Sequence, residues 1–176
     1  MTGFSFIGLV SLIDPPRSAA DVAVMKFRAA GIKVMMLTGD QPSTAAAMAH
    51  KVNIITQPEL EFNSILQNGL HGRMLSEEEA LNQCNAIVIH GDTLAREMEA
   101  EQSREPHDES RGISVIMKWL RTSEVVFARV TPSQKLFIVE LCQKMGHTVA
   151  VVGDGDNDEP AVRQANIGIA IGSGSS

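Results

Sequence analysis

The sequence is poor in features that would place it in several large classes of protein. Cysteine occurs only twice, at Cys84 and Cys142, which argues against the disulfide framework of a small secreted domain and favours a reducing compartment. No apolar run reaches the roughly 20 residues of a membrane-spanning helix. The first apolar stretch has no basic leader and no cleavage site, so it does not match a signal peptide. We therefore expect the chain alone to be soluble and cytoplasmic.

Basic tracts are missing as well. The net charge is −6 and no stretch concentrates Lys and Arg, so we expect no nucleic-acid partner.

The two cysteines could pair with each other. We expect two buried, unpaired thiols instead, because free cysteine behaves as a small hydrophobic residue.

The sequence does contain the pattern of a hydrophobic core. Hydrophobic residues make up 44% of the 176 residues, which is enough for one domain spanning residues 1–176. Six short apolar runs predict strands, and several lack polar alternation, as is typical of parallel strands buried on both faces. These runs are residues 4–11, 32–37, 86–89, 124–127, 148–152 and 167–170.

Segments with helical periodicity separate the apolar runs. Gly31 and Gly146 each follow such a segment, where we expect a left-handed cap. The alternation predicts an α/β, Rossmann-like, doubly wound fold with a mostly parallel sheet. Residues 56–123 are less regular, and the charged span 96–111 predicts a solvated helix followed by a loop. Three apolar stripes should face the core: Val22, Met25 and Ala29; Ala45, Met48, Ala49 and Val52; and Leu136, Val139 and Cys142.

Polar residues follow three of the predicted strands, and ligands of parallel sheets bind at the carboxyl ends of strands. The first group is Thr38, Gly39 and Asp40, directly before a predicted helix. A hydroxyl together with backbone amides suits a phosphoryl group. An ordinary strand-to-helix turn with a polar cap would have the same composition.

The second group begins with Thr131, which can cap a helix that has Pro132 at its first position. Lys135 then lies in the first turn, where the helix dipole disfavours a cation unless an anion is close. A lysine that contacts only water would look the same in the sequence.

The third group is the acidic stretch VVGDGDNDEP at residues 151–160. Crowded carboxylates repel one another unless they bind a cation, and Gly153 and Gly155 permit tight backbone geometry. A calcium loop is excluded, because its sixth and twelfth positions hold Glu159 and Ala165 instead of glycine and glutamate. A magnesium site that shares a phosphate, or a solvated turn, remains.

The order of these motifs resembles the haloacid-dehalogenase-like superfamily and, within it, the phosphorylation domain of P-type cation-transporting ATPases. The resemblance is to the alpha subunits of the sodium/potassium or proton/potassium pumps. The motifs that carry it are IDPPR at 13–17, GIKVMMLTGDQPSTA at 31–45, HGDTL at 90–94, VVFARVTPSQK at 125–135 and GDGDNDEPAVRQANIGIAIG at 153–172.

The resemblance implies a role for each matching residue. Asp154 and Asp158 would hold Mg²⁺, and Asp14 would lie with Arg17 near the hinge to a nucleotide-binding domain. The catalytic residues would be Lys135, Thr38 and Asp158, with Lys135 neutralising charge during phosphoryl transfer. The phosphate- or nucleotide-binding residues would be Thr38, Gly39, Asp40, Lys135, Asn157 and Arg17.

The chain departs from the family pattern in two respects. It has no D-K-T-G-T segment, so the strand that carries the nucleophilic aspartate is missing and no aspartyl-phosphate can form on this chain. In the acidic stretch, Asp156 replaces an aliphatic residue, Glu159 replaces Ser or Ala, and Asn166 replaces an aspartate. Asp156 would add repulsion if it pointed inward and would matter little if it pointed outward.

We therefore expect a fragment of a pump alpha subunit that binds magnesium and phosphate but is inactive alone. The parent would use ATP and Mg²⁺ to move cations at a membrane, with this part on its cytoplasmic face. Partners would be the nucleotide-binding, actuator and membrane domains and a beta subunit. The alternative is a free-standing, truncated, non-catalytic domain that binds magnesium, phosphate or a protein. A soluble phosphatase of the superfamily would need a D-x-D strand, and none precedes Phe4.

Overall fold

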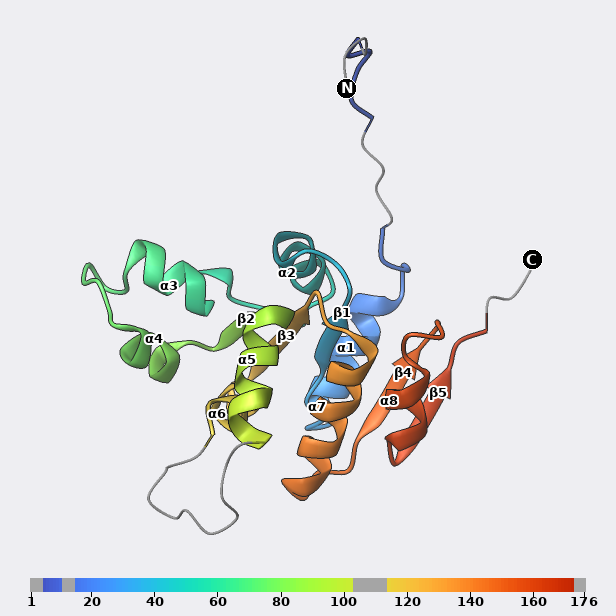
Figure 1. Cartoon of the computed structure of the whole chain (residues 1–176). Coiled ribbons are helices and arrows are strands. Elements are labelled where there is room, and N and C mark those ends of the chain that lie inside the picture. The colour runs from blue at the N-terminus through green and yellow to red at the C-terminus, as the bar shows by residue number, and fades with distance from the viewer. Residues whose placement is uncertain (1–4, 11–14, 103–113, 173–176) are drawn as a thin grey trace.

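The structure, a computed structural model, describes residues 5–10, 15–102 and 114–172. Helices and strands alternate along most of the chain (Figure 1). The helices are α1 (Ala20–Ala29), α2 (Pro42–Lys51), the 3₁₀ helix η1 (Pro58–Leu60), α3 (Phe62–Asn68), α4 (Glu77–Gln83), α5 (Gly91–Gln102), α6 (Val115–Arg121), α7 (Pro132–Lys144) and α8 (Glu159–Gln164). The strands are β1 (Met35–Thr38), β2 (Ala86–His90), β3 (Glu124–Ala128), β4 (Ala150–Gly153) and β5 (Ile167–Ala170).

The strands form two parallel sheets. The larger has the order β1-β3-β2, and β4 pairs with β5 in the smaller. The prediction of α/β architecture with parallel strands is therefore confirmed. Among the described residues the strands form two separate sheets, because no strand pairing joins β1 to β4, and this arrangement is compatible with the predicted Rossmann-like fold.

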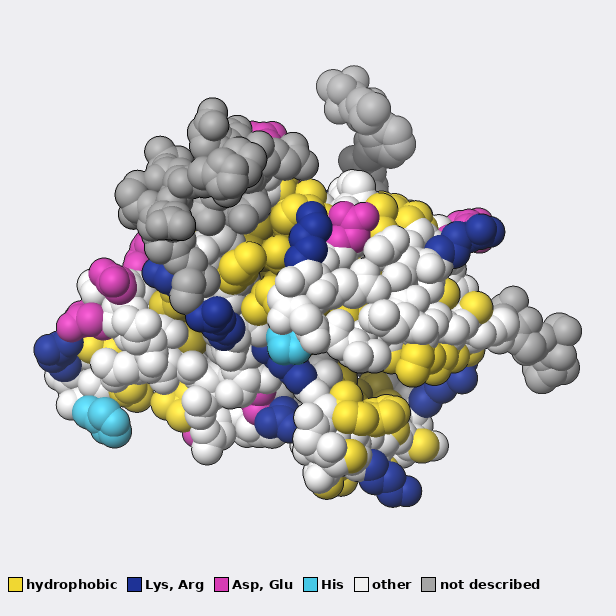
Figure 2. Space-filling view, turned by 90° about the horizontal axis from the view of Figure 1, so that it is seen from below, with side chains coloured by type: hydrophobic (Ala, Val, Ile, Leu, Met, Phe, Trp, Pro, Cys, Tyr) yellow, Lys and Arg dark blue, Asp and Glu magenta, His cyan; other side chains and the backbone are white. Residues whose placement is uncertain are grey.

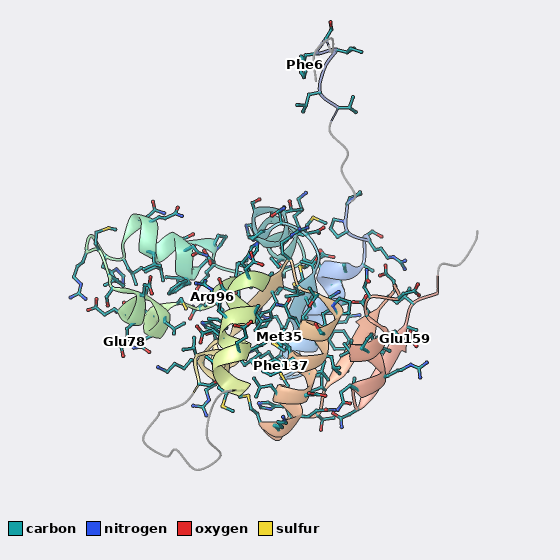
Figure 3. The ribbon with its side chains drawn as sticks, viewed as in Figure 1. Phe6, Met35, Glu78, Arg96, Phe137 and Glu159 are labelled. Atoms are coloured by element: carbon teal, nitrogen blue, oxygen red, sulfur yellow. The ribbon has the colours of Figure 1, made fainter. Side chains whose placement is uncertain are left out.

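The core of the larger sheet has two layers, because successive residues of β3 point to opposite faces. Val126 and Ala128 pack with α1 and α2 in one hydrophobic cluster. Val125 and Phe127 pack with α5, α6 and α7 in the other. Met35 of β1 and Phe137 of α7 lie beside this second cluster, and Figure 3 labels both in the layer between their elements.

Helix α7 connects the two sheets. One side of it packs on the larger sheet through Ile138, Leu141 and Cys142. At its far end Gln143 Nε2 donates to the carbonyl of Gln164, 3.0 Å away at the end of α8. Helix α8 in turn covers one face of the smaller sheet, since a Cβ on Gly168 of β5 would lie 2.3 Å from the carbonyl oxygen of Val162. The two sheets are thus positioned by helices and not by strand pairing.

The strand predicted at residues 4–11 is wrong for the described residues 5–10, which have no regular structure. Phe6 and Ile7 are 84% and 99% exposed, and Figure 1 shows this segment extending away from the body of the molecule. An apolar run forms a strand only where a sheet edge pairs with it, and no edge contacts these residues. Residues 4 and 11 lie outside the described residues.

The core stripes are confirmed for α2 and α7 but not for α1. Ala45, Ala49 and Val139 are buried as expected. In α1 the buried residue is Val24, whereas Val22 and Met25 remain exposed. The apolar stripe of α1 therefore faces a side that the described chain leaves uncovered.

The expected left-handed caps are confirmed at Gly31 and Gly146, with φ of 76° and 85°.

Helix α5 confirms the charged helix within residues 96–111, and the loop predicted after it lies outside the described residues. The 56–123 region contains η1, α3, α4, β2, α5 and α6. In the described ranges no helix is both long and apolar enough to cross a bilayer.

The two cysteines are free, as expected. Cys142 is buried and Cys84 is partly buried, and desolvation raises the pKa of both thiols.

Burial lowers the pKa of Lys33, whose Nζ donates to the carbonyls of Leu120 and Thr122 at the end of α6. This lysine ties the start of β1 to that helix.

Candidate functional site

The carboxyl ends of β1 and β3 lie side by side and carry the first two predicted groups. The N–H of Val130 donates to the carbonyl of Thr38 at 3.1 Å, and that of Arg129 donates to the carbonyl of Asp40 at 3.0 Å. Thr38 Oγ1 accepts the Asp40 N–H at 3.1 Å. Since that oxygen acts as an acceptor here, the hydroxyl proton of Thr38 remains available to a phosphoryl oxygen.

The start of α7 is fixed by a capping box. Thr131 Oγ1 accepts from the N–H of Gln134, whose side chain accepts from the N–H of Thr131, and Pro132 occupies the first turn. The predicted cap is therefore confirmed. Gln134 Nε2 also donates to the carbonyl of Gly91 at 2.7 Å, which joins this helix to the start of α5.

Lys135 and Asp158 form an ion pair between α7 and the loop after β4. Lys135 Nζ lies 2.5 Å from Asp158 Oδ1, and the two side chains are only 12% and 20% exposed. The anion that the position of Lys135 required is thus supplied by this chain. The pair also brings the carboxyl end of the smaller sheet close to that of the larger one.

Gly153 allows Asp158 to approach the end of β4. A Cβ at residue 153 would lie 2.5 Å from Cβ of Asp158, closer than two carbon atoms can pack. Gly155 has no such neighbour, and its φ is not in the left-handed region. The tight geometry expected of both glycines is therefore confirmed only at Gly153.

The other polar side chains of the acidic stretch face solvent. Asp154, Asp156 and Asn157 are exposed, and Glu159 pairs with Arg163 one turn further along α8. Asp156 thus adds no repulsion inside the site. No three acidic, histidine or cysteine side chains gather in metal-binding geometry within the part of the chain that the structure describes.

The donor set nevertheless suits Mg²⁺, which binds one or two carboxylates and keeps water or phosphate as its remaining ligands. Asp154 and Asp158 would be those carboxylates, since Asp154 directly follows β4 and Asp158 stands at the start of α8. Two predicted residues remain apart from this centre. Asp40 and Arg17 are exposed, and among the described residues no side-chain hydrogen bond joins either of them to Lys135 or Asp158.

Asn166, at the usual position of an aspartate, has a structural role. Its Oδ1 accepts from the N–H of Val149 at 2.9 Å and from Gln143 Nε2 at 3.2 Å. Both bonds need only an oxygen acceptor, so asparagine can replace a carboxylate here. This substitution therefore leaves the connection between α7 and the smaller sheet intact.

The structure also gathers residues that the sequence analysis did not single out. An open pocket of about 530 Å³ lies at the carboxyl ends of the larger sheet. Arg129 follows β3 with a φ of 57°, unusual for a residue other than glycine, and His90 ends β2 with Nδ1 accepting the Asp92 N–H at 3.1 Å. His90 ends β2 and Arg129 directly follows β3, and this position at a strand end is the sequence signal that both residues carry. The lining residues are Gly39, Gln41, His90, Asp92, Arg129, Val130 and Thr131.

A scan of protein-family models gives no match. Individual proteins do match over nearly the whole chain. The sodium/potassium-transporting ATPase subunit alpha-4 of Rattus norvegicus is 44% identical over 173 residues, which are 98% of this chain and 15% of that protein. The subunit alpha-2 of Homo sapiens is 46% identical over 95% of the chain, and the potassium-transporting ATPase alpha chain 1 of Xenopus laevis is 43% identical over 97%.

The chain spans about 15% of the length of these curated relatives. Such identity over at least 95% of the chain confirms the resemblance given by the motifs. The chain is therefore a homologue of one segment of the alpha subunits of the P-type cation-transporting ATPases.

Proposed function

We propose that this chain is the magnesium- and phosphate-binding part of a haloacid-dehalogenase-like phosphorylation domain in a P-type ATPase alpha subunit. The observation that carries the proposal is the largely buried ion pair between Lys135 and Asp158. It places a cation and a carboxylate where the carboxyl ends of two parallel sheets approach each other. Phosphoryl transfer needs this combination of positive charge and hard oxygen ligands.

Each element contributes one function to this site. The Thr38 hydroxyl and the amides near Gly39 would donate to phosphoryl oxygens, and the glycine leaves the space above it open, with no atom within 4 Å of a Cβ placed there. Lys135 would neutralise charge that develops on the phosphoryl group. Asp40 and Asn157, both exposed, would complete the polar surroundings.

Asp154 and Asp158 would hold Mg²⁺. The ion would supply a positive charge shared between the protein and the phosphate. The contact with Lys135 fixes one oxygen of Asp158, which leaves Oδ2 of that carboxylate for the ion. Asp154 is exposed and carries its carboxylate toward solvent, where the ion and its waters would enter.

The nucleophilic strand of the parent would lie between β1 and β4. Among the described residues β1 pairs in parallel with β3 alone and β4 pairs in parallel with β5 alone. A strand placed between them would end beside both Thr38 and Asp154. The parent would bind ATP and move sodium- or potassium-type cations, together with its nucleotide-binding, actuator and membrane domains and a beta subunit. Arg17 would serve the hinge to the nucleotide-binding domain.

Magnesium with orthovanadate, a phosphate mimic, should raise the melting temperature of the chain. At ten times the dissociation constant the gain is about 1.4 kcal/mol, or roughly 3–5 °C for a chain of this size. Asp154→Ala should abolish the rise, because the ion loses one of its two carboxylates. Differential scanning fluorimetry of both proteins measures the effect.

Asp156→Ala is the matched control, since it removes an exposed carboxylate two residues away. It should keep the full rise. Equal shifts in the wild type and in Asp154→Ala would refute the assignment of the metal ligand. If only Asp156→Ala lost the thermal shift, the metal ligand would be Asp156 and not Asp154.

The chain should release no phosphate from p-nitrophenyl phosphate above the buffer rate, because it has no aspartate in a D-K-T-G-T segment. Phosphate release in the presence of Mg²⁺ measures this directly. Turnover that disappears in Asp154→Ala would overturn the argument from the missing nucleophile.

A further inference from the structure

Gln134, in the first turn of α7, is a polar side chain that the fold buries. It is 7% exposed, and its amide makes two hydrogen bonds. Oε1 accepts from the N–H of Thr131 at 2.9 Å, and Nε2 donates to the carbonyl of Gly91 at 2.7 Å. Because a buried polar group without partners destabilises a fold, these two bonds restrict where the first turn of α7 can lie.

Gln134 and Lys135 hold this turn from two sides. Successive residues of a helix point about 100° apart, so the two side chains reach different neighbours. Gln134 contacts Gly91 at the junction of β2 and α5, whereas Lys135 Nζ lies 2.5 Å from Asp158 Oδ1, at the start of α8. A rotation of α7 that broke the first contact would carry Lys135 away from Asp158.

The partner of Gln134 is itself held in place. Gly91 approaches the carbonyl oxygen of Arg129 so closely that a Cβ at residue 91 would not fit. Gly91 directly follows β2, and Arg129 directly follows β3, the central strand of the larger sheet. The Gln134 amide therefore connects Lys135 to the carboxyl ends of two paired strands.

Glutamine at this position differs from what a helix start ordinarily favours. A capping box accepts Glu or Gln at the third helical position, and the helix dipole stabilises a carboxylate there. A second capping box, at the start of α4, has Glu79 at this position, directly after Glu77 and Glu78. The first turn of α7 has no acidic residue.

The figures show this acidic helix start away from α7. Figure 3 labels Glu78 on α4, and Figure 2 shows acidic side chains at the same left edge of the molecule. A carboxylate at residue 134 would offer no donor to the carbonyl of Gly91. It would also place a negative charge next to Lys135, where it would compete with a phosphoryl group for the lysine. An amide caps the helix and avoids both effects.

We propose that Gln134 is the positioning residue of Lys135. Its amide fixes the first turn of α7 to the junction of β2 and α5, which holds Lys135 Nζ against Asp158 without adding a negative charge. The effect on phosphate binding rests on the proposed function, in which Lys135 binds the phosphoryl group. The effect on the ion pair rests on the two contacts alone.

Two variants of the full 176-residue chain separate geometry from charge. Gln134→Met is neutral and of similar length but loses both hydrogen bonds, whereas Gln134→Glu keeps the acceptor for Thr131 and loses the donor to Gly91. Both should raise the dissociation constant of magnesium with orthovanadate at least about tenfold, as loss of the outer partners of a metal site commonly does. Isothermal titration calorimetry at a temperature where every variant is folded measures this constant.

Glu79→Met is the matched control, because it changes the same position of the capping box in α4. It should lower the unfolding midpoint and leave the dissociation constant unchanged. If it weakened binding as much as Gln134→Met does, a general loss of stability would explain the effect and the proposal would be wrong.

A double-mutant cycle tests the ion pair without any ligand. Urea unfolding of Lys135→Met, Asp158→Asn and the double variant gives the coupling between the two side chains. This coupling should fall by at least about half when Gln134→Met is added to all four proteins, whereas a residue that only stabilises the fold would leave it unchanged. If proteins with Gln134→Met do not fold, Gln134→Glu, which keeps the cap, takes its place in the cycle.

An unchanged coupling would overturn the proposal, whatever the binding measurements give. A wild-type chain that does not bind magnesium with vanadate would refute the proposed function, and the cycle would still decide whether Gln134 positions Lys135. A reduced coupling together with an unchanged dissociation constant would refute the role of Lys135 in phosphate binding. The two proposals therefore fail separately.

Discussion

Replacing Glu124 by alanine should lower the free energy of unfolding by about 3 kcal/mol. Glu124 starts β3, and its side chain is only 3% exposed. Its Oε1 lies 2.7 Å from Arg28 Nη2 and accepts from the Thr56 hydroxyl at 2.6 Å, and its Oε2 accepts from the Thr56 N–H at 2.9 Å. The substitution leaves a cation and two donors without their shared acceptor. Urea unfolding followed by circular dichroism measures the loss.

Glu159→Ala is the control for removing a glutamate from an ion pair. Glu159 and Arg163 are exposed one helical turn apart, so the loss should stay below about 0.5 kcal/mol. Glu124→Gln should fall between the two, because an amide oxygen still accepts from Thr56. A Glu124→Ala midpoint equal to that of Glu159→Ala would show that the buried network does not stabilise the fold.

This network illustrates what local patterns cannot predict. The sequence places Glu124 at the start of a strand, but its partner Arg28 is 96 residues away. Periodicity indicates which residues are apolar together and contains no information on partners so distant. For the same reason periodicity predicts that the apolar stripe of α1 faces the core, whereas the helix also carries Arg28, whose Nη1 donates to the carbonyls of Asn53 and Ile54.

Five of the six predicted strands form within a few residues of their expected ends, because buried parallel strands have a strong sequence signal. The sixth, at residues 4–11, has the same composition but no paired edge in the described structure. Composition determines whether a segment can be a strand, and pairing determines whether it becomes one. The division into two sheets has the same origin, since no sequence pattern shows which strands are neighbours.

The candidate site could be predicted in part from the strand-end rule. It singled out Thr38, Lys135 and Asp158, and the structure brings the last two together in an ion pair. It did not single out His90 and Arg129, which line a pocket together with Gly39 and Thr131, because a single histidine or arginine after a strand is common. The position of Arg129 depends on a close backbone approach that Gly91 permits, since a Cβ at residue 91 would lie 2.2 Å from the carbonyl oxygen of Arg129.

Replacing Gly91 by alanine should lower the free energy of unfolding by about 2 kcal/mol and distort this pocket. Gly91 opens α5 directly after β2. A Cβ there would lie 2.2 Å from the carbonyl oxygen of Arg129 and 3.2 Å from Oε1 of Gln134. Arg129 holds a left-handed φ of 57°, so the chain after β3 has little freedom to move aside. The displacement would reach α7 through the bond from Gln134 to the carbonyl of Gly91.

Gly39→Ala is the matched control, because no atom lies within 4 Å of its Cβ and its φ is not in the left-handed region. Its unfolding midpoint should stay unchanged or rise slightly, since alanine restricts the unfolded chain. Because α7 carries Lys135, Gly91→Ala should also reduce the thermal shift with magnesium and vanadate, although residue 91 touches neither predicted metal ligand. Two results together would refute this argument: an unfolding midpoint of Gly91→Ala equal to that of Gly39→Ala, and a full thermal shift with magnesium and vanadate. They would show that the close approach of Gly91 to Arg129 does not position Lys135.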